Sequence, residues 1–383
     1  MAIFFCVNKT FMQNSCLKLC LAVLLLAGCS PGKKTAQRPG DAAPFTLRFL
    51  DEYVLPHRPL VGGTQAGGFS SIDYDEAKGI YYLICDDRSE ISPARYYTMA
   101  IDIVKDRIDT VRLLGFTTLQ MPGGGNYPPR STDPEAMRYN KITGELVWTS
   151  EGERSKAAAL NPTIRVMHPD GTYKDSFPLP LRMHVSPGKG PRQNGVFEGL
   201  SFADGNKSVY VSIEEPLYED GPRAAGGDTA AWVRFLKFDV QTKKQVAEYA
   251  YRVEPVPYPA TPPDAYKING ISDILFLDAG RLIVIERAFS TGRNACAVRL
   301  WLADAGQATD ISSFPSLQGD LSFTPMRKKL LLDLDSLGRH IDNIEGITFG
   351  PLLPNGNRTL ILVADDNFSQ IQKNQILLFE ILP

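Results

Sequence analysis

Short apolar runs dominate the chain from Phe45 to Pro383. These runs of Val, Ile, Leu, Tyr and Phe are broken by Gly, Asp, Asn or Pro about every eight to twelve residues. No segment shows the apolar period of a capped amphipathic helix. The pattern therefore predicts an all-β fold and disfavours folds in which helices alternate with strands.

Five segments of this region share one pattern: a small or acidic residue, a short strand, a turn with Gly, and an apolar strand that ends in charged residues. These segments are Phe69–Ser89, Asp133–Glu153, Phe197–Pro216, Ile268–Ser290 and Asn343–Ser369. Their spacings are 64, 63, 74 and 73 residues when the equivalent positions are Ser71, Glu135, Glu198, Ser272 and Glu345. A period of about 70 residues is longer than a solenoid repeat and suits a four-stranded propeller blade.

The segments that follow these hairpins supply the outer strands. Examples are the apolar runs 95–104, 107–116, 232–240 and 245–253. The last repeat is followed by only one such run, 375–382, so we expect Thr46–Pro56 to complete its blade. Pairing of N- and C-terminal strands would hide the sheet edges. We predict a single five-bladed β-propeller over 45–383; a lone β-sandwich would not contain five equivalent hairpins.

The first 28 residues are typical of a signal peptide. Lys9 and Lys18 accompany an apolar run within Leu19–Ser30 that is too short to span a bilayer. The run ends in Leu26–Cys29, which resembles the bacterial lipobox, and this resemblance implies cleavage before Cys29 and lipidation of that residue. An uncleaved membrane anchor or a plain secretory signal is the alternative.

Residues 29–44 are rich in Pro, Gly and charge, and we expect a disordered tether. Ser30, rather than an Asp, follows the cysteine and favours the outer membrane over the inner membrane. We therefore expect an exported lipoprotein of the cell envelope that contacts the membrane only through its lipid anchor.

The chain carries 41 Lys and Arg against 43 Asp and Glu, a formal net charge of −2. Loss of Lys9 and Lys18 with the signal peptide would leave 39 basic residues and a net charge of −4. No basic tract stands out, which disfavours nucleic acid as a partner. We expect a monomer with a small-molecule substrate.

Besides Cys29, the mature chain would keep only Cys85 and Cys296; we expect buried free thiols, with a disulfide as the alternative.

Acidic residues recur where the first strand of each hairpin begins and the second strand ends. In a propeller these positions lie near the mouths of the central channel, where many carboxylates repel one another unless cations lie among them. One interpretation is a Ca²⁺ site with Asn194, Asn343 and Asn367 nearby. The other is structural, with acids that cap turns or pair with arginines. The acids are Asp86, Asp87, Asp133, Glu135, Glu151, Glu153, Glu198, Glu214, Glu215, Asp273, Glu286, Asp342, Glu345, Asp365 and Asp366.

Other catalytic patterns are weak. No G-x-S-x-G motif is present, and residues 123–130 lack the Lys-Ser/Thr of a phosphate-binding loop. A zinc site is not indicated because the histidines are isolated and lack ligand spacing. They are His57, His168, His184 and His340.

Several motifs together suggest a family. They are GGFSSIDYD, STDPEAMRY, GVFEGLSF, YVSIEEPL, LIVIERAF, MRKKLLLDLDSLG and DNIEGITFGPLLPNGNRTLILVADDNFS. As a set, from about Gly67 to Pro383, they resemble the bacterial phytase-like family, "esterase-like activity of phytase". The resemblance implies an often exported propeller that hydrolyses phosphate or other esters, without an assigned set of catalytic residues. Ala136 departs from the usual DPEG, and Ser272-Asp273 from the usual Ser-Glu.

We therefore predict a lipid-anchored phytase-like or esterase-like hydrolase with a divalent cation, Ca²⁺, at the channel mouth. The cation would neutralise the substrate anion and activate water. The expected catalytic residues are Glu135, Glu198 and Glu345. The expected substrate-binding residues are Arg192, Arg287 and Lys328. The expected metal ligands are Glu214, Asp273, Asp365 and Asp366. The alternatives are a non-catalytic surface propeller that binds a sugar, peptide or envelope partner, and a Ca²⁺-dependent lactonase-like hydrolase.

Overall fold

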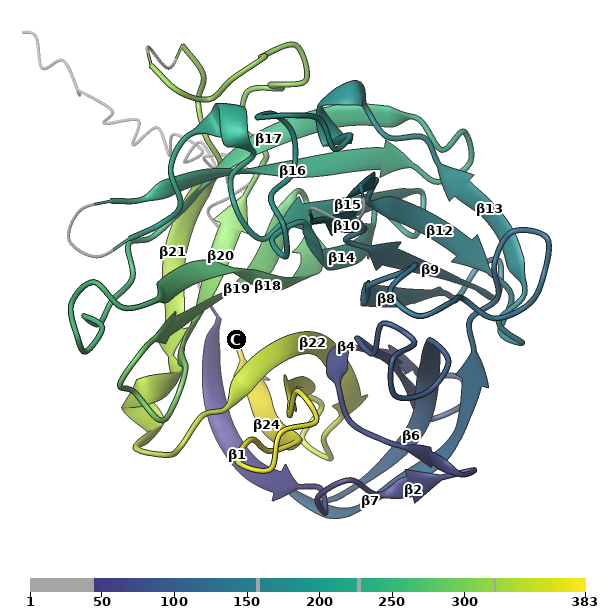
Figure 1. Ribbon diagram of the computed structural model, residues 1–383. Coiled ribbons are helices and arrows are strands. Elements are labelled where there is room, and N and C mark those ends of the chain that lie inside the picture. Colours follow the sequence, from purple (N-terminus) through teal and green to yellow (C-terminus); the bar gives the residue numbers. More distant parts are fainter. Residues whose placement is uncertain (1–44, 156–158, 226–228, 320–321) are drawn as a thin grey trace, which may run out of the picture. The chain divides into compact units, whose positions relative to one another are not determined.

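The computed structural model describes residues 45–155, 159–225, 229–319 and 322–383. These residues form five four-stranded sheets arranged around a central axis as the blades of a β-propeller (Figure 1). The predictions of an all-β fold and of five blades are confirmed. The predicted signal peptide, Cys29 and the tether lie outside the described residues, and their lipidation and membrane location stay predictions. Within the described part, no helix has the length and apolar character needed to cross a membrane.

The first three blades follow the chain from the inner strand outward. Blade 1 contains β4 (Phe69–Asp75), β5 (Ile80–Cys85), β6 (Arg95–Val104) and β7 (Arg107–Thr118). Blade 2 contains β8 (Pro134–Asn140), β9 (Glu145–Ser150), β12 (Thr163–Met167) and β13 (Tyr173–Phe177). Blade 3 contains β14 (Phe197–Ala203), β15 (Ser208–Ile213), β16 (Ala231–Asp239) and β17 (Gln245–Val253).

The last two blades complete the circle. Blade 4 contains β18 (Lys267–Asp278), β19 (Arg281–Ser290), β20 (Ala297–Asp304) and β21 (Arg327–Asp333). Blade 5 contains β22 (Asn343–Leu352), β23 (Arg358–Asp365), β24 (Gln375–Leu382) and β1 (Thr46–Val54). Smaller elements are the strands β2 (Leu60–Val61), β3 (Thr64–Gln65), β10 (Glu153–Arg154) and β11 (Ala159–Leu160), and the 3₁₀ turns η1 (Leu181–Met183), η2 (Tyr218–Asp220) and η3 (Leu334–Leu337).

The propeller closes as expected. The N-terminal strand β1 pairs antiparallel with the C-terminal strand β24, from Thr46 opposite Leu382 to Val54 opposite Gln375. The two strands lie side by side at the purple and yellow ends of the colour scale (Figure 1). The outer strands predicted at 95–104 and 245–253 coincide with β6 and β17. Closure leaves neither terminal strand without a partner inside its blade.

The apolar core lies between the blades. Each inner strand places an apolar side chain at one equivalent position, and all five are buried: Ile72, Met137, Leu200, Ile274 and Ile347. Cys85 and Cys296 are buried free thiols, as expected. Both belong to these apolar clusters rather than to a disulfide.

A buried ion pair joins the inner strands across the centre of the channel. The Arg138 Nη2 lies 2.6 Å from Asp273 Oδ2, and both side chains are at most 2% exposed. Arg138 also donates to Ser71 Oγ and to the Ile347 carbonyl oxygen. Asp273 in turn accepts from the Leu200 N–H. These bonds involve all five inner strands.

Candidate functional site

One β-bulge recurs near the start of each inner strand. The register of the inner hairpin skips a residue in each blade, and in blade 2 it skips both Glu135 and Ala136. A bulge turns a side chain away from the regular alternation of the strand. The skipped positions, called the bulge ring here, are Ser70, Glu135, Glu198, Ser272 and Glu345. Ser70, rather than the predicted Ser71, is therefore the equivalent residue in blade 1.

A second ring lies on the second strand of each hairpin or directly after it. Here the same backbone bond recurs, for example from the Asp86 N–H to the Gly68 oxygen and from the Glu214 N–H to the Val196 oxygen. The register places one residue per blade at this level. This strand-end ring consists of Asp86, Glu151, Glu214, Arg287 and Asp365. Four carboxylates and one guanidinium thus lie directly above the bulge ring.

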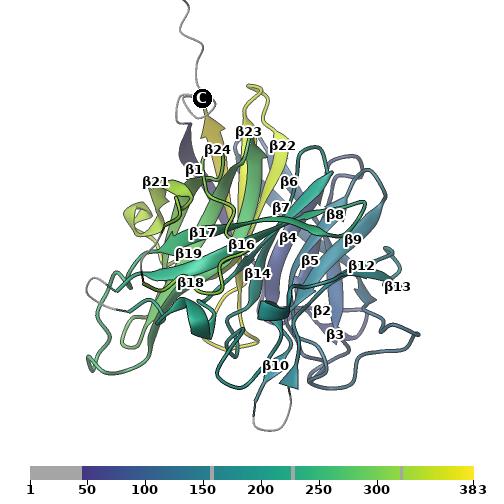
Figure 2. The same cartoon turned by 90° about the horizontal axis from the view of Figure 1, so that it is seen from above.

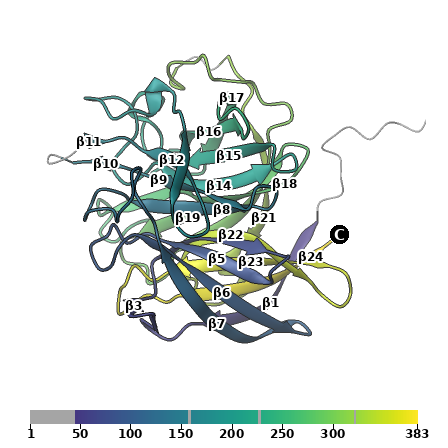
Figure 3. The ribbon, with the colours of Figure 1, turned by 90° about the vertical axis from the view of Figure 1, so that its right-hand side faces the viewer.

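Six residues of the two rings line a cavity of about 390 Å³, whereas Ser70, Ser272, Glu151 and Asp365 are not part of its lining. Its lining residues come from the strand ends and loops on the side of the propeller opposite the C-terminus. Figures 2 and 3 show the β2–β3 and β10–β11 hairpins at this end. Blade 4 supplies an apolar wall of Tyr266, Ile268 and Phe289. The charged lining consists of the acids Asp86, Asp133, Glu135, Glu198, Glu214 and Glu345 and the bases Arg88 and Arg287. Acids therefore outnumber bases three to one in this cavity.

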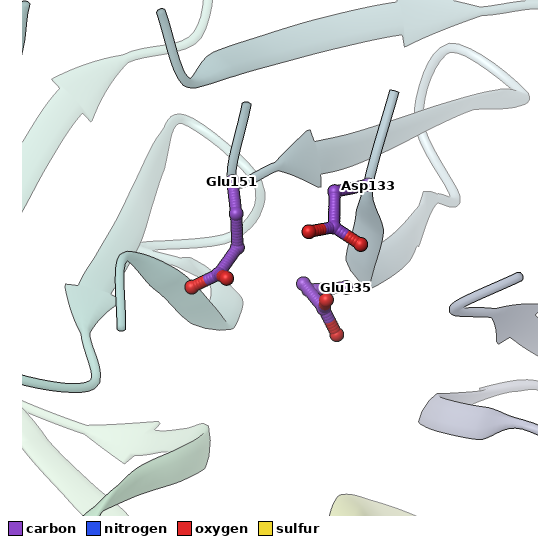
Figure 4. Close-up of side chains that lie close together, drawn as sticks. All are labelled: Asp133, Glu135 and Glu151. Carbon is purple, nitrogen blue, oxygen red and sulfur yellow. The ribbon is translucent and has the colours of Figure 1, made fainter. Parts of the chain in front are cut away.

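Asp133, Glu135 and Glu151 form a buried acidic trio in blade 2. One carboxylate oxygen of each lies within 4.8 Å of the others, and Figure 4 shows the three side chains close together. Glu135 accepts a 2.6 Å hydrogen bond from Ser70 Oγ. The Glu151 Oε2 is buried and has no hydrogen-bond partner among the described residues. The trio could hold a metal ion.

Two arginines compensate part of the negative charge. Arg287 binds Glu345 at 2.6 Å and Glu214 at 2.9 Å. The Arg88 Nη2 lies 3.1 Å from the Asp133 Oδ2 of the trio. These pairs fix Glu214 and Glu345, whereas Glu198 accepts no hydrogen bond from any other described residue. Glu198 is only 5% exposed, so its ionised form is costly without a cation.

Burial raises the pKa of these carboxyl groups. Burial raises the pKa of Asp133 to about 7, against the lowering effect of Arg88. The pKa of Glu214 also rises to about 7 through burial, although Arg287 opposes the shift. Burial and neighbouring acids hold the pKa values of Glu135 and Glu198 well above the usual range. The metal-free cavity therefore retains protons near neutral pH.

We expect the metal-free protein to lose stability as the pH rises. The folded state binds more protons than the unfolded chain between the ordinary carboxyl pKa of about 4 and the folded value of about 7 for Asp133. The free energy of unfolding should therefore fall across this window. In EDTA, we expect a melting temperature lower at pH 8 than at pH 5 by about 5 °C or more. A flat or rising profile in calorimetry would contradict this expectation.

Two glycines make room for the carboxylates. Gly68 has φ +62°, and a Cβ there would lie 2.2 Å from Asp86 Oδ1. A Cβ on Gly270 would lie 2.5 Å from the Glu214 Cγ. A larger residue at either position would displace an acid of the strand-end ring.

The structure brings some of the predicted site residues together and separates others. Glu135, Glu198, Glu214, Arg287 and Glu345 line the cavity, and Asn194, Asn343 and Asn367 lie there too. Asp365 occupies the strand-end ring behind Glu345, and burial and nearby acids hold its pKa well above the usual range.

Four predicted residues lie elsewhere. Asp273 faces the channel centre, where its oxygens accept from Arg138 and backbone N–H groups. Asp366 accepts from the Gly68 N–H, as a turn cap would. The Lys328 ammonium lies 2.6 Å from Glu286 on the outer part of blade 4. Arg192 donates to the Pro216 and Gly221 carbonyl oxygens, beside the cavity rather than in it.

The sequence places Asp86, Asp133 and Glu151 among the acids near the channel mouth but does not single them out as metal ligands. The repeated hairpin carried the signal for all three: Asp86 and Glu151 directly follow the second strands β5 and β9, and Asp133 directly precedes the first strand β8. Arg88, which follows the same strand end as Asp86, is a candidate cation for the acidic ring but not one of the predicted substrate-binding residues.

The fold and the site define a five-bladed propeller with a buried acidic, potentially metal-binding cavity at one end of its channel. The chain belongs to the phytase-like family: the family model described as "esterase-like activity of phytase" matches residues 64–368. This membership makes it a hydrolase-like propeller protein. Among curated proteins, no sequence matches the chain.

Several solved structures match the chain at low sequence identity. A thermostable family-43 glycoside hydrolase shares 11% identity, with 84% of this chain and 92% of that chain covered and a TM-score of 0.46. An exo-β-1,3-galactanase from Phanerochaete chrysosporium shares 12% identity, with 87% and 64% covered and a TM-score of 0.45. A putative oxidoreductase (glucose dehydrogenase) from Thermus thermophilus shares 12% identity, with 88% and 100% covered and a TM-score of 0.35. At these values no activity is carried over to this chain.

Proposed function

We propose that this protein hydrolyses phosphate or carboxylic esters in the acidic cavity, with Ca²⁺ as its cofactor. The observation that carries the proposal is the excess of buried carboxylates over arginines around one cavity. Burying these carboxylates in their ionised form is energetically unfavourable unless protons or a cation neutralise their charge. The family assignment supports ester hydrolysis as the reaction.

The donor set fits calcium. All three side chains of the trio offer carboxylate oxygens. Hard oxygen ligands without histidine or thiolate favour Ca²⁺ over zinc. Asp133, Glu135 and Glu151 would hold the ion, and the unpartnered Glu151 Oε2 is a free ligand atom. When bound, the cation would supply Lewis acidity and neutralise a substrate anion.

The remaining residues of the cavity would position the substrate and move protons. The guanidinium of Arg287 would orient the anionic oxygens of the ester. Glu198 has no hydrogen-bond partner among the described residues and would accept a proton from the attacking water. In the reaction, the water oxygen bonds to phosphorus or to the acyl carbon, the ester bond to the alcohol breaks, and the alcohol oxygen gains a proton. Tyr266 and Phe289 would exclude water from one side.

An activity screen tests this proposal. We expect release of phosphate from phytate or of p-nitrophenol from its phosphate or acetate ester when CaCl₂ is present, and loss of that activity in EDTA. A lactone in the same panel would separate lactonase activity from phosphatase activity. Hydrolysis that persists in EDTA would overturn the role of the cation. No turnover of any of these substrates with added Ca²⁺ would favour a non-catalytic binding protein.

A further inference from the structure

A second cavity lies at the opposite end of the channel, beyond the Arg138–Asp273 pair. Its volume is about 440 Å³, within the range of small-molecule sites. It opens where the inner strands end, on the side of the C-terminus. None of the acids or arginines that line the first cavity lines this one.

Five aromatic side chains line this second cavity, one from each inner strand. They occupy the same position, four residues after the bulge ring, and every one is half-buried. This aromatic ring consists of Tyr74, Tyr139, Phe202, Phe276 and Phe349. Each ring packs partly against the apolar core and contributes its remaining surface to the lining of the cavity. The five together therefore form an aromatic surface that a ligand could contact.

Neighbouring side chains hold several of these rings in place. Tyr74 stacks on Tyr81 with centroids 4.6 Å apart. Phe276 stacks on the buried Tyr210 at 6.0 Å. Cations already lie over two other rings, since Lys78 is 4.8 Å from the centroid of Tyr139 and Arg358 is 4.8 Å from that of Phe349. Phe202 has no stacked ring and no overlying cation among the described residues, and Phe276 has no overlying cation, so these two are the rings best suited to contact a ligand.

The polar groups of the cavity are balanced in charge. Asp73, Ser201 and Thr348 lie at its floor, each immediately before the aromatic residue of its strand. The Arg138 Nε is also buried and has no hydrogen-bond partner among the described residues. The charged lining contains three acids and three bases, namely Asp73, Asp75, Glu76, Arg138, Lys141 and Arg358. This balance favours a neutral ligand, in contrast to the acidic cavity.

We propose that this second cavity binds a neutral carbohydrate. The partly positive C–H face of a sugar ring packs on the negative face of an aromatic ring. Its hydroxyl groups would find acceptors and donors in Asp73, Ser201 and Thr348. A site with aromatic walls, a polar floor and no net charge fits this class of ligand better than an ion or a lipid.

Binding to an array of neutral oligosaccharides tests the proposal. We expect the intact protein to bind one or more of them, and Phe202→Ala and Phe276→Ala to weaken binding about tenfold, measured as a higher dissociation constant. Asp73→Asn, which keeps the shape of the side chain, should also weaken binding. Phe289→Ala alters an aromatic of the other cavity and should leave glycan binding unchanged. Melting temperatures show whether each variant is folded.

Three outcomes would overturn the proposal. The first is that no neutral glycan binds to the folded protein. The second is that only charged glycans bind. The third is that binding persists unchanged in Phe202→Ala and Asp73→Asn. None of these outcomes depends on whether the acidic cavity hydrolyses esters.

Discussion

Replacing both Glu135 and Glu151 with glutamine is expected to abolish tight Ca²⁺ binding and to lower kcat for ester hydrolysis by roughly 100-fold or more. Glutamine keeps the size of each side chain but removes the charges that would hold the cation. Both acids belong to the trio whose oxygens lie within 4.8 Å. Calorimetric titration with CaCl₂ and initial rates on the best ester measure the two effects.

Glu215→Gln is a matched control for this double variant. Glu215 is as buried as the trio but pairs with Arg223 outside the acidic cavity. We expect its Ca²⁺ affinity and its rate to stay within about twofold of the parent protein. If the double variant behaves like this control, the trio does not hold the cation.

Arg138→Met is expected to lower the free energy of unfolding by about 3–5 kcal/mol. The substitution leaves the Asp273 carboxylate, which is 0% exposed, without its 2.6 Å partner. It also removes bonds from Arg138 to Ser71 and Ile347, so the inner strands lose their common link. The midpoint of urea unfolding measures the loss.

A surface pair provides the comparison. Arg281 and Asp278 form an ion pair in which Asp278 is 57% exposed. Arg281→Met should therefore cost less than about 1 kcal/mol. Adding Asp273→Asn to Arg138→Met should recover part of the stability, because no buried charge then remains unpaired. A loss below about 1 kcal/mol for Arg138→Met would mean that the central pair does not secure the propeller.

Much of the fold could be predicted from local pattern. Five hairpins with the same sequence pattern predict five equivalent blades. The last blade is one strand short after the run 375–382, which predicts a partner strand at the other end of the chain. β1 pairs with β24 as predicted. The bulges could not be predicted, because the inner strands are buried on both faces and show no regular alternation in which an extra residue would stand out. The sequence therefore predicts Ser71 as the equivalent position, one residue away from Ser70 in the bulge.

The acidic site was only partly predictable for a related reason. Glu345 and Asp273 both follow the start of an inner strand, but Glu345 lies in the bulge and faces the cavity. Asp273 lies one residue later and faces Arg138. A shift of one residue on a strand reverses the direction of the side chain. Which acids converge therefore depends on register, whereas the presence of an acidic ring depends only on the repeats.

Diffraction from crystals grown or soaked with CaCl₂ tests the central claim most directly. We predict an ordered ion in the acidic cavity with oxygen ligands from Asp133, Glu135 and Glu151 at about 2.3–2.6 Å. At saturating Ca²⁺, the absence of an ion, with each carboxylate held only by backbone amides and by Arg88 or Arg287, would contradict it.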